Sequence, residues 1–260
     1  MLPNFLILGA QKSASTFIQD CLSEHPEVFM PENETPFFES PDYENGELIE
    51  LESLFDGRGE RLLGIKRPAY LAKPEVPERI AQHIPDAKLV AILRNPLERS
   101  ISAYYHNMRY GFIPPRNIEA GLRDIITGKY EFDYPRSGEI IEFGRYHKHL
   151  QRYTKHFGKE QILILFHEDI LNDKLGEVRK TYRFLGVDES FVPKALNSRP
   201  QAVLYSLTRL RLLALRNRFT YSYSKTRTRV YLKKMNRLEA LITRLIVDCC
   251  PNYLKAGNHS

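Results

Sequence analysis

The chain has 260 residues, of which 42% are hydrophobic and 27% are charged, and its formal net charge at pH 7 is +6. This composition, with 15 Tyr, 14 Phe and 16 Pro, is typical of a globular protein of one large or two small domains and excludes a coiled coil or a disordered tract. The sequence has no run of eighteen apolar residues, so we expect no transmembrane helix.

Four short apolar segments bounded by turn residues predict β-strands. They are hydrophobic at consecutive positions, which is typical of strands buried on both faces of a parallel sheet. The first segment has no basic residues before it and ends at Gly9, so we interpret it as a strand and not as a signal peptide. The four segments are Phe5–Leu8, Leu62–Ile65, Lys88–Leu93 and Gln161–Phe166.

Helical periodicity separates these strands. Strands that alternate with helices predict an α/β fold, here a P-loop-like central parallel sheet flanked by helices and joined by right-handed crossovers. We expect this domain to cover residues 1–200. The expected helices are Thr16–Ser23, Pro77–His83, Leu97–Arg109, a four-turn face from Phe143 to Phe157, and Val178–Leu185 before Gly186.

The pattern changes in the last sixty residues. Beyond about residue 203 only helical spacing of apolar residues continues, first from Leu204 to Leu213 and then from Met235 to Leu245. The intervening residues 216–229 are rich in Tyr, Ser, Thr and Arg, and we expect a loop or a lid there. We therefore predict that residues 201–260 form a basic helical C-terminal segment, packed on or extending the same domain.

Positive charge is concentrated in this C-terminal segment. Residues 201–260 contain twelve Lys or Arg but only Glu239 and Asp248 as acids, a net charge of +10, so the first 200 residues carry −4. This asymmetry indicates an anionic partner, although a solvated helical face also explains it. The partner we expect is an anionic surface that residues 205–245 contact peripherally, and not a nucleic acid.

The cysteines and histidines predict no metal site. Cys249 and Cys250 are adjacent and leave only Cys21, so we expect no disulfide framework, and the eight histidines lack metal-ligand spacing. We therefore expect a cytoplasmic protein, with or without peripheral attachment to a membrane.

The segment LGAQKSAST, residues 8–16, joins the first strand to the first helix. Such a turn presents unbonded backbone N–H groups and the positive end of the helix dipole, and both attract anions. Lys12 adds a positive charge, and Ser13, Ser15 and Thr16 add hydroxyl donors. The spacing is not that of the Walker A loop, G-x-x-x-x-G-K-[ST], because no Gly precedes Lys12. By itself the segment is equally compatible with an N-cap turn and a solvent-facing Lys12.

A second group of polar residues follows the strand Lys88–Leu93. Arg94 lies at the carboxyl end of this strand, where α/β sheets bind ligands, and Pro96 is placed to open a helix. Ser102 lies eight residues after Arg94, on that helix. A guanidinium at the strand end and a hydroxyl on the next helix can bind one phosphate together; an Arg on a surface turn and a helix-face Ser are the alternative.

These two segments resemble motifs of the PAPS-dependent sulfotransferases. The order strand, G-x-x-K-S-x-[ST]-T, helix, and then strand, R-x-P-x-x-R-x-x-S-x-Y, is most similar to bacterial relatives of the heparan sulfate (carbohydrate) sulfotransferases. The resemblance implies that the first segment binds the 5′-phosphosulfate of 3′-phosphoadenylyl sulfate (PAPS) and that the second binds its 3′-phosphate. The residues carried over are Lys12, Ser13, Ala14, Ser15 and Thr16 for the first and Arg94 and Ser102 for the second. Ala14 stands where the family usually has Gly, and we expect a helical or extended φ there, with a slightly tighter turn.

Two further segments resemble the family's active-site motifs. PENETPFF is similar to E-x-H-F-F, whose Glu is the catalytic base, so the resemblance gives this role to Glu34, with Pro36 in place of the His. GIKRPAY is similar to E-K-[ST]-P-A-Y, whose active-site Lys corresponds to Lys66, with Arg67 in place of the Ser or Thr.

Two more matches extend the resemblance to residues 4–200. Tyr146, within FGRY, follows the family's order and is expected to bind the donor. Arg199, within NSRP, lies where the family has a basic loop that closes over the cofactor, and we give it the same role.

The resemblance implies a metal-free, in-line transfer of a sulfuryl group from PAPS to an acceptor hydroxyl, which we expect on a carbohydrate or glycoconjugate such as a glycolipid. Lys12 would stabilise the charge that develops on the leaving phosphate, Glu34 would act as general base, and Lys66 would hold Glu34 or the sulfuryl group. Three alternatives stay open: Glu34 as one more acid of an acidic loop, Lys66 as a structural ion-pair partner, and His106 as the base.

Two other classes of function also stay open. A P-loop kinase of a small molecule would need the full Walker A spacing and an Mg²⁺-binding acid, and we find neither in the sequence. A non-catalytic basic module that binds nucleic acid or anionic lipid would fit the basic residues interleaved with Tyr at 216–231. Binding of adenosine 3′,5′-bisphosphate distinguishes the sulfotransferase from both.

Overall fold

The fold is that of a computed structural model, which describes residues 1–41, 43, 48–198, 206–224, 230–234, 236, 238–241 and 243. The chain divides into two compact units. The first, the sheet unit, comprises Met1–Arg99 and Phe143–Ala202, and the second, the helical unit, comprises Ser100–Glu142 and Val203–Ser260. The predicted domain boundary at residue 200 stays a prediction. The two units are defined by contacts within the fold, and the helical unit combines the internal segment Ser100–Glu142 with the C-terminal segment Val203–Ser260.

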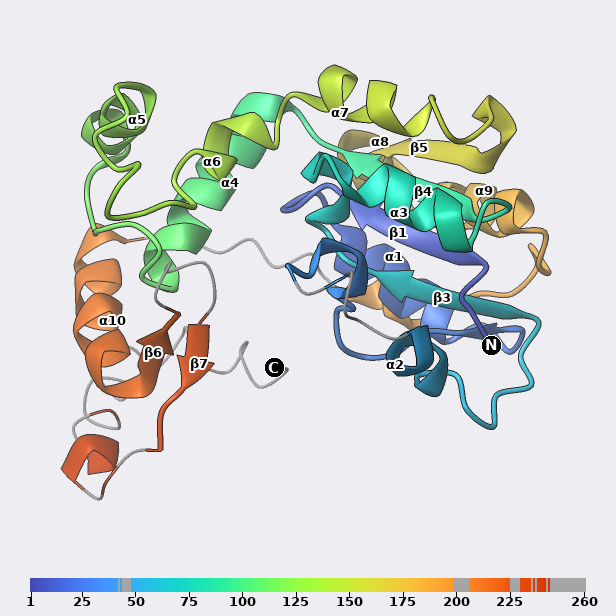
Figure 1. Cartoon of the computed structure of the whole chain (residues 1–260), viewed down its shortest axis with the longest axis horizontal. Coiled ribbons are helices and arrows are strands. Elements are labelled where there is room, and N and C mark those ends of the chain that lie inside the picture. Colours follow the sequence, from blue (N-terminus) through green and yellow to red (C-terminus); the bar gives the residue numbers. More distant parts are fainter. Residues whose placement is uncertain are drawn as a thin grey trace. The chain divides into compact units, whose positions relative to one another are not determined.

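A five-stranded parallel sheet forms the centre of the sheet unit (Figure 1). Its strand order is β2-β3-β1-β4-β5, so β1 lies between β3 and β4. The four predicted strands and their parallel pairing are confirmed, while β2, with two residues, is too short to produce a sequence pattern. The strands are β1 (Phe5–Gly9), β2 (Val28–Phe29), β3 (Leu62–Lys66), β4 (Lys88–Leu93) and β5 (Ile162–Phe166).

Helices cover both faces of this sheet because the side chains of β1 alternate between two apolar layers. Phe5 and Ile7 pack into one layer, and Leu6 and Leu8 pack into the other. All four side chains are fully buried, and burial of each contributes roughly 1.5–3 kcal/mol. The predicted α/β fold is therefore confirmed. The first layer is completed by α1 (Ser15–Ser23), α8 (His167–Asn172) and α9 (Lys174–Leu185), and the second by α2 (Leu48–Ser53), α3 (Val76–His83) and α7 (Tyr146–Tyr153).

The helix predicted from Phe143 to Phe157 is shorter in the structure. α7 includes only Tyr146–Tyr153, and both phenylalanines are buried outside it. Gly144 lies within the predicted range and just before α7, and a Gly inside a helix costs about 1 kcal/mol relative to Ala. The unit also contains the short 3₁₀ helices η1 (Phe37–Glu39), η3 (Tyr70–Ala72), η4 (Lys159–Gln161) and η5 (Lys194–Asn197).

The helical unit contains most of α4 (Pro96–Arg109), whose first turn belongs to the sheet unit. Its core is one cluster of buried residues from four helices, including Tyr104, Met108, Ile125, Ile140 and Leu210. The other helices of the unit are α5 (Ile118–Ile126), α6 (Glu139–Glu142) and α10 (Leu207–Thr220). α10 confirms the first of the two helices predicted in the C-terminal segment.

A two-stranded antiparallel hairpin follows α10 and corrects two predictions. It consists of β6 (Tyr221–Tyr223) and β7 (Val230–Leu232). The expectation of helices alone beyond residue 203 is therefore wrong. The loop or lid expected over 216–229 is wrong for residues 216–223, because Arg216–Thr220 belong to α10 and Tyr221–Tyr223 form β6. Residues 225–229 lie outside the described residues, and of the second predicted helix positions 238–241 and 243 are described and are helical. In the part of the chain that the structure describes, the helices are too short or too polar to cross a membrane.

Candidate active site

The predicted anion loop, residues 10–14, connects the carboxyl end of β1 to α1. Because β3 and β4 lie on opposite sides of β1, this position is the topological switch point at which such sheets bind ligands. Lys12 and Ala14 have φ values of 70° and 68°. The predicted helical or extended φ of Ala14 is therefore wrong: Ala14 adopts the left-handed conformation that best suits Gly, the residue usual in the sulfotransferases.

Three hydroxyl side chains follow Lys12 in this loop and in the first turn of α1. Ser13 is fully buried and Ser15 nearly so, whereas Thr16 is exposed. Among the described residues, Oγ of Ser13 has the Tyr146 phenol beside it but forms no hydrogen bond of normal geometry, and a buried hydroxyl in that state is costly. An anion oxygen would relieve this cost, and the first N–H groups of α1, which lack intrahelical partners, lie beside it. The loop thus fits a phosphate or a phosphosulfate.

Arg94 follows β4 and reaches the same loop. Its Nη1 donates a long hydrogen bond of 3.4 Å to the carbonyl of Lys12, and its Nη2 donates to Oε2 of Glu98 at 2.9 Å. Tyr146, the first residue of α7, lies close to the backbone of Arg94 and to the Ser13 hydroxyl; burial raises the pKa of this phenol, and both neighbours oppose the rise. The structure therefore brings the predicted residues Lys12, Ser13, Arg94 and Tyr146 together.

Lys66 is the last residue of β3, the strand beside β1. Its ammonium group donates to Oγ1 of Thr16 at 3.0 Å, and the residue is 4% exposed. Burial lowers the pKa of Lys66, while the nearby carboxylate of Glu34 opposes this shift. The strand ends approach closely because Gly9 has no side chain: a Cβ there would collide with the carbonyl oxygen of Pro68. A buried positive charge thus lies next to the first turn of α1.

Glu34 lies in the segment between β2 and η1, which is tied to the end of β3. The N–H of Thr35 donates to the carbonyl of Lys66 at 3.1 Å. Oε2 of Glu34 accepts a hydrogen bond of 2.7 Å from Nη1 of Arg67, whose Nε donates to Glu39 at 2.8 Å. The Glu34 side chain is 40% exposed, so an acceptor that arrives from solvent can reach its carboxylate.

The catalytic and donor-binding roles of all the predicted site residues stay predictions, including those of Ser102 and Arg199. Ser102 lies on α4, eight residues after Arg94, in the part of that helix that belongs to the helical unit. Arg199 lies outside the described residues. His106, the alternative base, also lies on α4, where its ring packs against Tyr110 with a centroid distance of 4.8 Å.

Two arginines join this cluster although we predicted no role for them. Arg67 holds the Glu34 carboxylate, and its only sequence signal is its departure from the family's Ser or Thr. Arg99 is the second Arg of R-x-P-x-x-R and is fully buried; burial lowers its pKa, and the neighbouring Tyr146 phenol opposes this. The fixed motif spacing was a signal that pointed to Arg99. Among the described residues, His, Cys, Asp and Glu form no cluster of three or more that could hold a metal ion.

Comparison with models of protein families gives one match that covers most of the chain. Residues 2–237 match the family model described as a sulfotransferase domain. The chain belongs to the sulfotransferase family. This confirms the resemblance inferred from the two motifs, and it extends the family match beyond residue 200 into the segment that contains α10 and the hairpin.

Two relatives of this chain have names that refer to heparan sulfate. It is 29% identical over 201 residues to mouse heparan sulfate glucosamine 3-O-sulfotransferase 3A1, covering 74% of this chain and 48% of that protein. It is 29% identical over 197 residues to human bifunctional heparan sulfate N-deacetylase/N-sulfotransferase 2, covering 72% of this chain and 22% of that one. The chain thus spans about half the length of the first relative and about a fifth of the second.

A solved structure resembles the chain over its full length. A sulfotransferase from Alicyclobacillus acidocaldarius is 25% identical, with a TM-score of 0.68 and coverage of 98% of both chains. The sulfotransferase domain from the curacin biosynthetic pathway has a TM-score of 0.54 at 14% identity, which shows a shared fold.

Proposed function

We propose that the protein is a PAPS-dependent sulfotransferase that moves a sulfuryl group to a hydroxyl of a carbohydrate or glycoconjugate. One observation carries this proposal. A loop suited to a phosphosulfate, a buried Lys66 and an accessible Glu34 lie together at the carboxyl edge of the sheet, joined by the hydrogen bond between Lys66 and Thr16. Membership of the sulfotransferase family supports the same reaction.

The donor end of the site is the loop and the start of α1. The backbone N–H groups of this turn, with the Ser13, Ser15 and Thr16 hydroxyls, would bind the 5′-phosphosulfate of PAPS. Lys12 would neutralise the negative charge that grows on the leaving phosphate oxygen. Arg94 and Ser102 would bind the 3′-phosphate, which distinguishes this nucleotide from ATP.

The acceptor end is Glu34 and its partner Arg67. Glu34 would accept the proton of the acceptor hydroxyl as its oxygen attacks sulfur, and the sulfur–oxygen bond to the phosphate breaks in line. Arg67 binds one carboxylate oxygen at 2.7 Å and fixes the orientation of Glu34. Lys66, close to both Thr16 and Glu34, would hold the transferring group between the two ends of the site.

The acceptor class comes from the relatives. The two relatives named above have names that refer to heparan sulfate. We extend a carbohydrate acceptor to this chain because it shares 29% of residues with each of them, over 74% and 72% of its own length.

Transfer of sulfate tests the proposal directly. Purified protein is incubated with ³⁵S-labelled PAPS and desulfated heparan sulfate, and labelled polysaccharide is counted. We expect label in the glycan, and its loss in Lys12→Ala. Label transfer from γ-³²P-ATP with Mg²⁺, and none from PAPS, would contradict the proposal and favour a kinase.

A further inference from the structure

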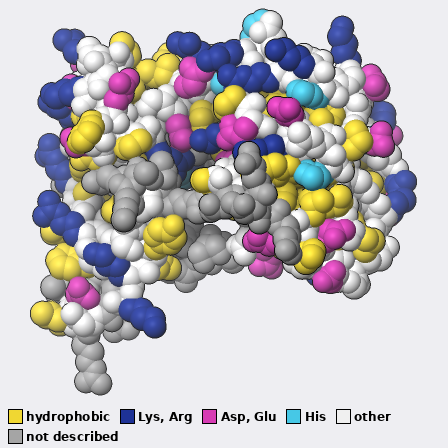
Figure 2. Space-filling model, in the orientation of Figure 1, with side chains coloured by type: hydrophobic (Ala, Val, Ile, Leu, Met, Phe, Trp, Pro, Cys, Tyr) yellow, Lys and Arg dark blue, Asp and Glu magenta, His cyan; other side chains and the backbone are white. Residues whose placement is uncertain are grey.

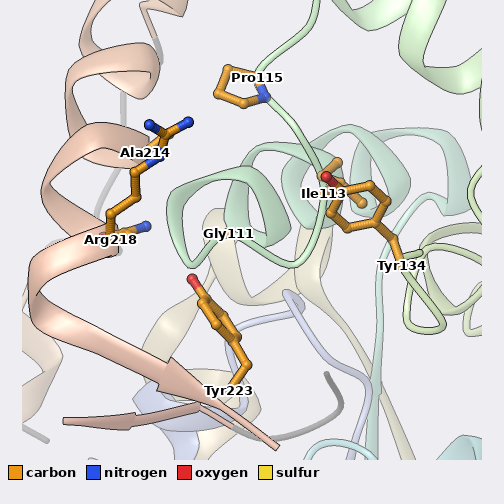
Figure 3. Close-up of a pocket in the computed structure, with 8 residues that line it drawn as sticks. Gly111, Ile113, Pro115, Tyr134, Ala214, Arg218 and Tyr223 are labelled. Carbon is orange, nitrogen blue, oxygen red and sulfur yellow. The ribbon is translucent and has the colours of Figure 1, made fainter. Parts of the chain in front are cut away.

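The helical unit contains a groove of its own, between α10 and the loop that follows α4. A pocket of ≈ 360 Å³ is lined by Gly111, Ile113 and Tyr134 on one side and by Ala214 and Arg218 of α10 on the other. A second pocket of ≈ 270 Å³ shares Ala214 and Arg218 with the first, so the two are continuous along α10. Figure 3 shows Ala214 and Arg218 of α10 across from the loop, with the hydroxyl of Tyr223 directed toward Gly111.

The groove is positively charged. Arg211 and Arg218 both line the second pocket, and because they are seven residues apart they lie two turns apart on one face of α10. Both side chains are exposed, and among the described residues neither has an ion-pair partner. The lining residues include no acid. Figure 2 shows further Lys and Arg side chains on the surface around α10.

The walls of the groove combine apolar and polar groups. Ala214, Leu215 and Ile113 supply carbon surface, and Asn217 and the tyrosines supply polar groups, the mixture that ligand pockets use. The loop is fixed by the hairpin, since the Tyr223 hydroxyl donates to the carbonyl of Tyr110 at 2.8 Å. The pocket is therefore a formed feature of the fold.

We propose that this groove binds an anionic stretch of the glycan acceptor, with Arg211 and Arg218 pairing with carboxylate or sulfate groups on neighbouring sugars. A sugar ring has C–H faces and hydroxyls that match the mixed walls, and the two guanidiniums provide charge complementarity. This inference rests on the proposed carbohydrate acceptor and names its class: an acidic polysaccharide and not a neutral one.

Two other anionic partners fit the groove less well. The surface of a membrane is flat and does not enter a concave pocket. Single-stranded nucleic acid stacks its bases on aromatic faces, but the ring of Tyr223 packs edge-on against Phe112 at 6.1 Å and that of Tyr134 against Tyr130 at 5.5 Å.

Direct binding of a heparan sulfate hexasaccharide to the full chain tests the inference, with a neutral maltohexaose as control. Arg218→Glu is compared with Arg123→Glu, an exposed Arg on α5 of the same unit that does not line either pocket. Both changes alter the net charge equally. We expect Arg218→Glu to weaken the binding of the hexasaccharide by about tenfold or more, the loss of a charge-assisted contact, and Arg123→Glu by less than about threefold.

A second variant separates the pocket from diffuse attraction. Ala214 lines both pockets and is half-buried, so Ala214→Phe fills the groove without a change of charge. We expect it to weaken hexasaccharide binding as well. Equal losses in Arg218→Glu and Arg123→Glu, with no loss in Ala214→Phe, would overturn the inference, because binding would then depend on net charge alone.

Competition identifies the ligand class. The binding of the hexasaccharide is measured in competition with a single-stranded oligonucleotide of equal charge and with vesicles that contain phosphatidylserine. If either binds as tightly and is equally sensitive to Arg218→Glu and Ala214→Phe, the glycan assignment is wrong. Binding of adenosine 3′,5′-bisphosphate is measured in the same samples: its absence in the wild type contradicts the proposed function, whereas its presence without hexasaccharide binding contradicts only this inference.

Discussion

The ammonium group of Lys66 donates a hydrogen bond to the hydroxyl of Thr16 at 3.0 Å. Lys66 ends β3 and Thr16 lies in the first turn of α1, so this bond joins the residue expected to hold the sulfuryl group to the predicted donor end of the site. The bond also places the charge of Lys66 in a nearly buried position. Removal of this charge from water lowers the stability of the folded protein, a cost that a residue with a purely structural role would not need to carry.

Replacement of Lys66 should therefore stabilise the protein and impair it as an enzyme. We expect Lys66→Met to raise the free energy of unfolding at pH 7 by about 1 kcal/mol, because an apolar side chain of similar length avoids the desolvation of a charge. Transfer of sulfate should fall at the same time. Urea unfolding measures the first effect, and the exposed Lys155→Met, expected to change stability by less than about 0.5 kcal/mol, is the control.

The stability difference should depend on pH in a defined direction. Burial lowers the pKa of Lys66 in the folded state below the value of 10.5 that applies to the unfolded chain. Between these two values the unfolded chain binds more protons, so the stability of the wild type rises with pH. The advantage of Lys66→Met should be complete below the folded pKa and should disappear as the pH approaches 10.5. An advantage that stays constant across this range would show that the charge of Lys66 is not its cause.

Glu34→Gln tests the general base. The amide keeps the size of the side chain but accepts no proton, so we expect turnover to fall by about 10²–10⁴-fold while adenosine 3′,5′-bisphosphate binds as before. The matched control is Glu32→Gln, an exposed acid two residues away, which should leave turnover unchanged. If Glu34→Gln retains full turnover, the base lies elsewhere, and His106→Gln becomes the decisive variant.

Ala14→Gly tests the left-handed turn of the anion loop. The φ of 68° destabilises Ala by roughly 1–2 kcal/mol relative to Gly. The larger conformational entropy of Gly in the unfolded chain offsets part of the stabilisation that the substitution brings. We expect a net stabilisation of about 0.5 kcal/mol, measured by urea unfolding. The same substitution in a helix, Ala81→Gly in α3, should instead destabilise by about 1 kcal/mol. Destabilisation by Ala14→Gly would mean that the loop has another backbone conformation.

Gly111→Ala tests the contact between the α4 loop and the hairpin. A Cβ there would overlap the Tyr223 hydroxyl, and the φ of 75° adds backbone strain, so we expect a loss of about 1–3 kcal/mol. Gly57→Ala is the control, since its φ of 71° is similar and nothing lies near its Cβ. Addition of Tyr223→Phe should recover part of the loss in Gly111→Ala. Equal effects at Gly57 and Gly111 would show that the hairpin does not pack on this loop.

Much of the sheet unit could be predicted from local sequence. Lys88–Leu93 and Gln161–Phe166 are apolar at nearly every position. The structure buries β4 between β1 and β5, where such a run is required, whereas β5 is a partly buried edge strand. The residues of the anion loop and Arg94 could be placed for a related reason: each directly follows a strand, and parallel strands bring their carboxyl ends to one edge.

The remaining features depend on contacts between distant residues or on backbone geometry. Arg67 acts through Glu34 and Glu39, which lie 33 and 28 residues before it, and no spacing rule identifies such an ion-pair network. The left-handed φ of Ala14 contradicts the local preference of Ala, because the loop geometry overrides it. The hairpin was missed because Tyr221–Tyr223 and Val230–Leu232 are three-residue strands in a segment rich in Arg and Ser.

The measurement that tests the central claim most directly is calorimetric titration of the protein with adenosine 3′,5′-bisphosphate, compared between the wild type, Arg94→Ala and Glu98→Gln. Arg94 reaches the anion loop and also pairs with Glu98 at 2.9 Å, so Glu98→Gln removes that pair but keeps the guanidinium. We predict that the wild type and Glu98→Gln bind the bisphosphate and that Arg94→Ala loses at least about tenfold in affinity. Equal affinities in all three proteins, or binding of ATP with Mg²⁺ and not of the bisphosphate, would contradict the assignment of this site to a sulfotransferase donor.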